Sequence, residues 1–109
     1  MDAEIDRSKF EQMSGDLRFL PLVASGFLQQ LPQWYVEFAS AIAAQNKEDT
    51  LALLHKIKGS CYAVAAYGAV DVLKQAEKAY ALGNPLVTSE LLSRVASVAT
   101  ELRVIVAHA

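Results

Sequence analysis

The sequence predicts an all-α protein, an antiparallel four-helix bundle with a short additional N-terminal helix. Of its 109 residues, 53% are apolar, mainly helix-compatible alanine, leucine and valine. No long run alternates apolar and polar residues in the manner of strands. Turn residues divide the chain into one short and four longer segments with short connections, the layout of such a bundle. We expect a single domain over residues 1–109, large enough to bury its own core.

The first two helices are predicted from apolar spacing and from the residues that interrupt it. A short helix over Ile5–Met13 places Ile5, Phe10 and Met13 on one face, and a Ser-Gly-Asp turn ends it. A second helix covers about Leu20–Ala44. The apolar positions of this second helix are Leu28, Leu31, Tyr35, Phe38 and Ile42.

Pro32 lies inside the second predicted helix. A proline there removes one hydrogen bond and clashes with the preceding turn. Because the apolar spacing continues across it, we predict a kink near residues 29–32 rather than a clean break. Trp34 and Tyr35 are expected to be packing residues.

The third helix contains the most informative residues of the chain. Asn46 opens it, and acidic residues in its first turn suit the helix dipole. At about 100° per residue, His55, Gly59 and Tyr62 fall together at the margin of the apolar face, so His55 should border the core without entering it. That apolar face comprises Leu53, Leu54, Ile57, Cys61 and Val64.

Two further helices complete the predicted bundle. The fourth covers about Ala66–Leu82 and ends at Gly83, ahead of an Asn-Pro pair. Thr88 is expected to cap the fifth, which runs to about Ala107. The inward positions are Ala69, Leu73, Ala76 and Tyr80 in the fourth helix, and Leu91, Leu92, Val95, Val98, Leu102 and Ile105 in the fifth.

The spacing of His55, Lys58 and Gly59 suggests a reactive imidazole. Residues four apart share a helix face, and side chains lean toward the N-terminus, so a side chain at position 59 would cover the His55 ring. Glycine inside a helix costs roughly 1 kcal/mol relative to alanine. Its presence here therefore suggests that access to the ring outweighs local stability. Lys58 adds a cation within reach of an anion at the ring. A nucleophilic or phosphoryl-carrying imidazole needs this combination; the alternative is a solvent-facing histidine beside an unrelated glycine.

Composition narrows the possible functions. One cysteine, Cys61, excludes a disulfide framework and is expected in the core, and two distant histidines, His55 and His108, are too few for a metal site. The acidic N-terminus lacks a secretory layout, and no apolar run reaches the length of a membrane span. A net charge of −2 with scattered lysines and arginines offers no basic stripe for nucleic acid. We expect a cytoplasmic monomer without cofactor, membrane or nucleic-acid partner.

The sequence resembles the histidine-containing phosphotransfer (HPt) domains, which relay phosphoryl groups between receiver domains in bacterial multistep two-component phosphorelays. The resemblance covers nearly the whole chain from Ile5 onward. Its most specific part is HKIKGS at His55–Ser60, similar to the family pattern of histidine, any residue, an apolar residue, lysine, glycine, then serine or alanine. The short first helix, Pro32, the polar turn at 45–49 and the helix after Gly83 fit the same register.

The resemblance implies a role for each matched residue. His55 matches the phosphoryl acceptor, Lys58 the lysine beside the phosphoryl group, and Gly59 the small residue that lets a partner approach. Glu77 falls where family members often place a glutamate or glutamine that hydrogen-bonds the other ring nitrogen. A carboxylate accepting from Nδ1 would leave Nε2 as the nucleophile. The alternative for Glu77 is a solvated surface charge.

One position departs from the family pattern. About ten residues after the histidine the family usually has a glycine followed by alanine, whereas this chain has Ala65 and Ala66, with a glycine later at Gly68. Both versions are small and compatible with close helix packing. The change leaves the connection between the third and fourth helices open, but does not touch the acceptor site.

The resemblance implies a phosphoryl carrier without independent turnover rather than an enzyme. A free imidazole is largely neutral at cytoplasmic pH, so Nε2 of His55 would attack an aspartyl phosphate reversibly. Lys58 and Lys56 would attract the phosphoryl oxygens, and the Mg²⁺ would belong to the receiver partner. The expected partners are response regulator receiver domains or a hybrid sensor histidine kinase. They would dock around His55 through Leu51, Lys56, Tyr62 and unspecified residues of the second helix, although Leu51 is equally compatible with the core.

Other interpretations stay open. One is an interaction module that binds a receiver domain or a kinase without transfer, and another is a kinase substrate domain from a larger hybrid sensor. The dimerisation and phosphoacceptor helix pair of a histidine kinase is disfavoured. An acidic residue usually follows the histidine there, whereas Lys56 follows His55.

Overall fold

The structure, a computed structural model, describes residues 3–109, so Met1 and Asp2 of the acidic N-terminus lie outside the described residues. Within that range every regular element is a helix, which confirms the predicted all-α class. A short helix and one 3-10 turn precede four long helices. These elements are α1 (Arg7–Ser14), η1 (Leu17–Phe19), α2 (Leu20–Ala43), α3 (Lys47–Ala63), α4 (Tyr67–Ala81) and α5 (Thr88–Ala107).

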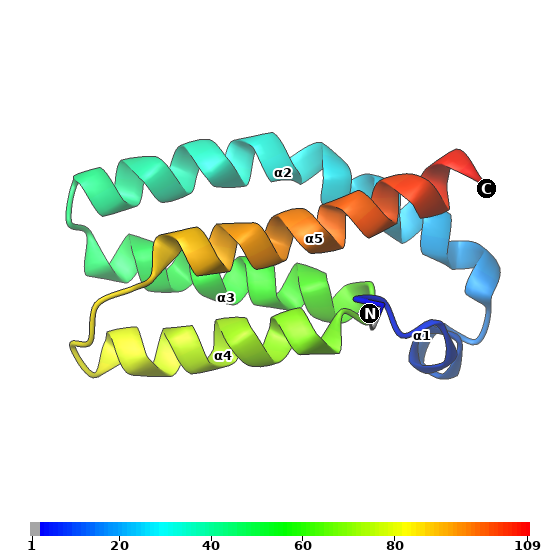
Figure 1. Cartoon of the computed structure of the whole chain (residues 1–109), viewed down its shortest axis with the longest axis horizontal. Helices are drawn as coiled ribbons and strands as arrows, with labels where there is room; N and C mark the ends of the chain where they lie inside the picture. The colour runs from blue at the N-terminus through cyan, green and yellow to red at the C-terminus, as the bar shows by residue number, and fades with distance from the viewer. Residues whose placement is uncertain (1–2) are drawn as a thin grey trace.

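The four long helices form a bundle in which α2 and α4 each pack against both α3 and α5. Figure 1 shows consecutive helices running in opposite directions. The α2–α3 and α4–α5 connections lie at one end, and the α3–α4 connection lies toward α1 at the other. Over residues 3–109, none of the helices is long and apolar enough to cross a membrane. The short connections between antiparallel helices account for this arrangement.

The core lies along the axis of the bundle and draws on all four long helices. Among the largest fully buried side chains are Trp34, Leu54, Leu73 and Leu102, one from each long helix. Burial of each such side chain stabilises the fold by roughly 1.5–3 kcal/mol. Cys61 is also fully buried, as predicted, and burial raises the pKa of its thiol to about 12. Cys61 is therefore a packing residue and not a thiolate nucleophile.

Helix α2 runs through Pro32 without a break, as predicted. In Figure 1 its ribbon changes direction along its length, with the N-terminal part inclined toward α1. Trp34 is buried, and its ring meets Phe27 edge-on at 5.0 Å between ring centroids, as expected for a packing residue. Tyr35 is 36% exposed and lies outside the core, although its spacing matches that of Leu31 and Phe38. Leu31 and Phe38 are compatible with an inner face that contains either Trp34 or Tyr35. Packing against the other helices places Trp34 inside. The buried positions of α2 are Leu20, Ala24, Phe27, Leu31, Trp34, Phe38 and Ala41.

Two helix starts also differ from the prediction. Helix α1 begins at Arg7, and Ile5 lies before it as a buried residue of the N-terminal segment. The Glu101 carboxylate holds this segment by accepting hydrogen bonds from the backbone N–H groups of Glu4 and Ile5, at 2.6 and 3.2 Å. Thr88 is the first residue of α5, while Val87 occupies the N-cap position that Thr88 was expected to fill.

The α3–α4 connection closes tightly although it lacks the glycine of the family pattern. Ala65 adopts the left-handed conformation, with φ at 59°, and its carbonyl accepts a hydrogen bond from the N–H of Asp6 at 3.0 Å. Gln45, between α2 and α3, is also left-handed, with φ at 53°. This conformation costs a residue with a Cβ roughly 1–2 kcal/mol. Gly68 lies in the first turn of α4 rather than in this left-handed position, and a Cβ there would collide with the Arg94 guanidinium.

Replacing Gln45 with glycine should raise the free energy of unfolding by about 1 kcal/mol, because the backbone strain disappears while this exposed side chain loses no buried area. Urea denaturation followed by circular dichroism measures the change. The matched control is Ala39→Gly at an exposed position inside α2, which should lose about 1 kcal/mol. Equal losses in both variants would contradict the strain at Gln45.

Candidate functional site

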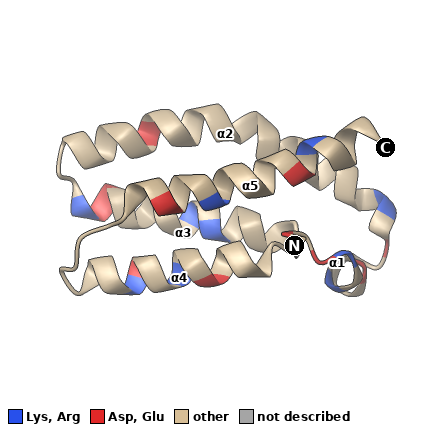
Figure 2. Cartoon of the chain, viewed as in Figure 1, with Lys and Arg blue, Asp and Glu red and all other residues tan. Residues whose placement is uncertain are grey.

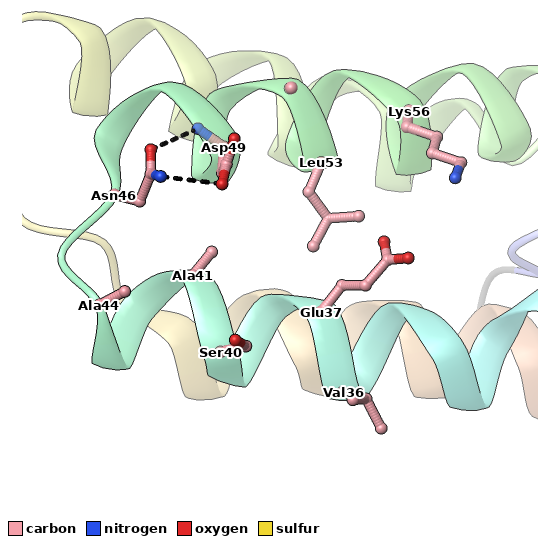
Figure 3. Close-up of a pocket in the computed structure, with 10 residues that line it drawn as sticks. Val36, Glu37, Ser40, Ala41, Ala44, Asn46, Asp49, Leu53 and Lys56 are labelled. Carbon is pink, nitrogen blue, oxygen red and sulfur yellow. Dashed lines mark hydrogen bonds between the residues drawn. The ribbon is translucent and has the colours of Figure 1, made fainter.

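The rotation of α3 about its axis is set by its buried face, and this rotation decides where His55 points. Leu53, Leu54 and Ile57 are buried on the inner side of the helix, as predicted. His55 therefore lies outside the core, and its side chain is 76% exposed. Asn46 starts the helix in the predicted way, because its side-chain oxygen accepts a hydrogen bond from the N–H of Asp49 at 3.0 Å (Figure 3).

Glu77 of α4 reaches across to α3 and contacts two of the predicted site residues. One carboxylate oxygen, Oε1, lies 3.4 Å from Nδ1 of His55. The other, Oε2, accepts a hydrogen bond from Nζ of Lys58 at 2.9 Å. The Glu77 and Lys58 side chains are only 20% and 21% exposed. Glu77 is therefore a largely buried bridge between the two helices rather than a solvated surface charge.

The Oε1 atom of Glu77 is buried, and none of the residues that the structure describes donates a hydrogen bond to it. Nδ1 of His55 is close to it but outside hydrogen-bond geometry. A carboxylate can only accept, so a protonated Nδ1 turned slightly toward Oε1 would satisfy this oxygen. The arrangement thus favours the tautomer in which Nδ1 carries the proton and Nε2 has the free lone pair.

Gly59 leaves open space one turn after His55. A Cβ added at this position would meet no other atom within 4 Å, apart from its own local backbone, among residues 3–109. Its backbone is helical, so conformation does not require glycine either. Neither packing nor backbone geometry therefore requires a glycine at this position, and its role in keeping the ring accessible stays a prediction.

The predicted partner-binding residues occupy two sides of His55. Leu51 and Tyr62, one turn before and two turns after it, lie along the same face of α3. Leu51 is half-buried, whereas Tyr62 is 52% exposed and meets Tyr67 edge-on at 5.6 Å between ring centroids. Lys56 instead projects toward α2.

Lys56 lines a groove of about 470 Å³ between α2 and α3 that sequence reasoning missed. In Figure 3, Glu37 of α2 and Lys56 of α3 point toward one another across this groove. Glu37 is the one charged residue of α2, a signal that could have identified it from the sequence. Small side chains, including Ser40 and Ala52, leave the space between the two helices open.

Elsewhere, basic and acidic residues are mixed along α3, α4 and α5 in the view of Figure 2, and they form no large patch of one sign. Among residues 3–109, no group of three or more histidine, cysteine, aspartate or glutamate side chains could hold a metal ion. The His55, Lys58 and Glu77 cluster is thus the most distinctive chemical feature of the described chain.

No protein-family model, curated protein or solved structure matches this chain. The site is therefore interpreted from its own geometry and from the sequence pattern.

Replacing Gly59 with alanine should increase the free energy of unfolding by about 1 kcal/mol, because alanine favours the helix and its Cβ enters open space. Urea denaturation measures this gain. Gly26→Ala on α2, which also enters open space, should give a similar gain, whereas Gly68→Ala should gain less because the Arg94 guanidinium must move aside. A loss of stability in Gly59→Ala would show that packing requires this glycine.

Proposed function

We propose that this protein is a histidine phosphotransfer protein of a two-component phosphorelay. His55 would accept a phosphoryl group from the aspartate of one receiver domain and pass it to another. The observation that carries this proposal is an exposed imidazole with a buried carboxylate, Glu77, at its Nδ1 side and open space beside it at Gly59. The HKIKGS pattern at His55–Ser60 supports the same function.

The chemistry needs no further nucleophile or base. The lone pair on Nε2 attacks the phosphorus of an aspartyl phosphate, the N–P bond forms, and the P–O bond to the aspartate breaks as its carboxylate leaves. The ring becomes positively charged if Nδ1 keeps its proton. Glu77 is placed to stabilise that charge, because its Oε1 lies 3.4 Å from Nδ1. The second transfer reverses these steps, with the Mg²⁺ supplied by the receiver partner.

The proposed docking surface surrounds His55 on α3. Leu51 and Tyr62 contribute apolar surface along the face of α3 that carries the His55 ring, and Lys56 lines the groove beside α2. A receiver domain would present its phosphorylated aspartate at the gap above Gly59. On this proposal the protein acts in the cytoplasm as a monomeric carrier without a cofactor of its own, and its partners are receiver domains or a hybrid sensor histidine kinase.

Replacing His55 with glutamine should abolish phosphoryl transfer, because an amide cannot form the N–P bond. The measurement mixes each variant with purified receiver domains labelled on the aspartate and follows acid-labile label on this protein. His108→Gln, at the exposed end of α5, is the matched control and should be labelled like the wild type. Equal labelling of His55→Gln would refute the proposed acceptor. A stable complex without any labelled wild-type protein would instead identify a binding module.

Replacing Gly59 with leucine should slow transfer about tenfold or more, because a side chain one turn after His55 obstructs the approach to the ring. The fold should be kept, since a Cβ at position 59 meets open space. The rate of label transfer and a urea denaturation curve are measured on the same sample. Ala96→Leu adds the same bulk at an exposed position of α5 and should not change the rate. A normal rate in Gly59→Leu would contradict the access role of the glycine.

A further inference from the structure

Lys58 is engaged before any phosphoryl group arrives. Its Nζ donates to Oε2 of Glu77 at 2.9 Å, and both side chains are about four-fifths buried, so the pair is screened less than a surface pair. His55 contacts the other oxygen of the same carboxylate. The lysine and the imidazole therefore share one negative charge.

This sharing has a consequence for the imidazole. A carboxylate beside a histidine ring stabilises the protonated imidazolium form, and an imidazolium has no lone pair on Nε2 with which to attack phosphorus. Glu77 on its own would thus orient the ring but also favour its non-nucleophilic form. A cation bound to the same carboxylate offsets the second effect and leaves the first, because it neutralises the charge without removing the acceptor oxygen near Nδ1.

We propose that Lys58 is a positioning residue that acts through Glu77 to keep His55 neutral and nucleophilic in the unphosphorylated protein. This role differs from the direct contact with the phosphoryl group that the sequence pattern implies, and it rests on the proposed function. The other lysine near His55, Lys56, is directed toward Glu37 and the α2–α3 groove instead. Glu77 of α4 is the charged group that contacts His55, and Lys58 of α3 binds the same carboxylate. Glu37 of α2 and Lys56 of α3 line the groove instead.

The decisive experiment is a double-mutant cycle read by NMR titration of the His55 ring, with Lys58→Met, Glu77→Gln and the double variant. Methionine keeps most of the apolar length of lysine without its charge. The only other histidine, His108, lies at the end of α5 and serves as the internal reference. In Lys58→Met the His55 titration should move to higher pH, since the full carboxylate charge then holds the ring proton. In the Glu77→Gln background the same lysine substitution should have no effect.

A direct repulsion between Lys58 and the imidazolium would give a different result. The shift caused by Lys58→Met would then persist in the Glu77→Gln background, and the proposal would be overturned. It would equally be overturned if Lys58→Met left the His55 titration unchanged. Circular dichroism of each variant verifies that the helices are retained, and Lys58→Arg, which keeps the charge at Glu77, should restore the wild-type titration.

The kinetic counterpart uses phosphoramidate, a small donor that transfers its phosphoryl group to imidazole nitrogen and releases ammonia. Near neutral pH, Lys58→Met should be phosphorylated roughly threefold more slowly than the wild type. About two pH units higher, where the ring is neutral in both proteins, the two rates should be equal. A slow rate that persists at high pH would assign Lys58 to direct phosphoryl contact instead. Because neither measurement involves a receiver domain, failure of receiver-dependent transfer would refute the proposed function while leaving this coupling testable.

Discussion

Burial of one face of α3 is the constraint on which the rest of the site depends. Leu54, Ile57 and Cys61 are at most 3% exposed, and rotating the helix about its axis would bring them into water at a cost of roughly 1.5–3 kcal/mol for each large side chain. With that face fixed, residues one position away point elsewhere by about 100° each. His55 then faces solvent and Lys58 faces α4. The apolar core thereby sets the direction of groups that it does not contact.

The site also requires a residue of α4 that lies level with His55 and Lys58 along the bundle axis. Glu77 supplies a carboxylate that is mostly removed from water, and one of its oxygens lacks a hydrogen-bond donor among the described residues. An unsatisfied buried polar atom typically costs about 1–3 kcal/mol. Trp34 Nε1 in the core also lacks a partner among the described residues, so what distinguishes Glu77 Oε1 is its distance of 3.4 Å from Nδ1 of His55. This oxygen without a donor faces His55, the residue that the HKIKGS pattern also marks as the candidate phosphoryl acceptor.

Sequence reasoning was most successful where the determinants are local. The positions of His55 and Gly59 on the margin of one helix follow from spacing within α3, and Asn46 caps that helix as its residue type suggests. Reasoning failed where two helices had to be placed relative to each other. The choice between Trp34 and Tyr35, both apolar and adjacent, is decided by what packs against α2. Likewise the groove beside Glu37 and the Lys58–Glu77 pair join residues 19 or more positions apart, and no local pattern specifies such distances.

The glycines of this chain differ in whether their backbone conformation requires glycine. Four residues of the described chain adopt the left-handed backbone. Gly15 and Gly83 are glycines, whereas Gln45 and Ala65 occupy it at an energetic disadvantage to glycine. Gly59 shows the opposite case, since its helical backbone and empty surroundings would accept alanine with a gain in stability. Gly26 inside α2 has equally open surroundings, so open space alone does not identify a functional glycine. What distinguishes Gly59 is its position one turn after His55, on the helix face that carries the ring.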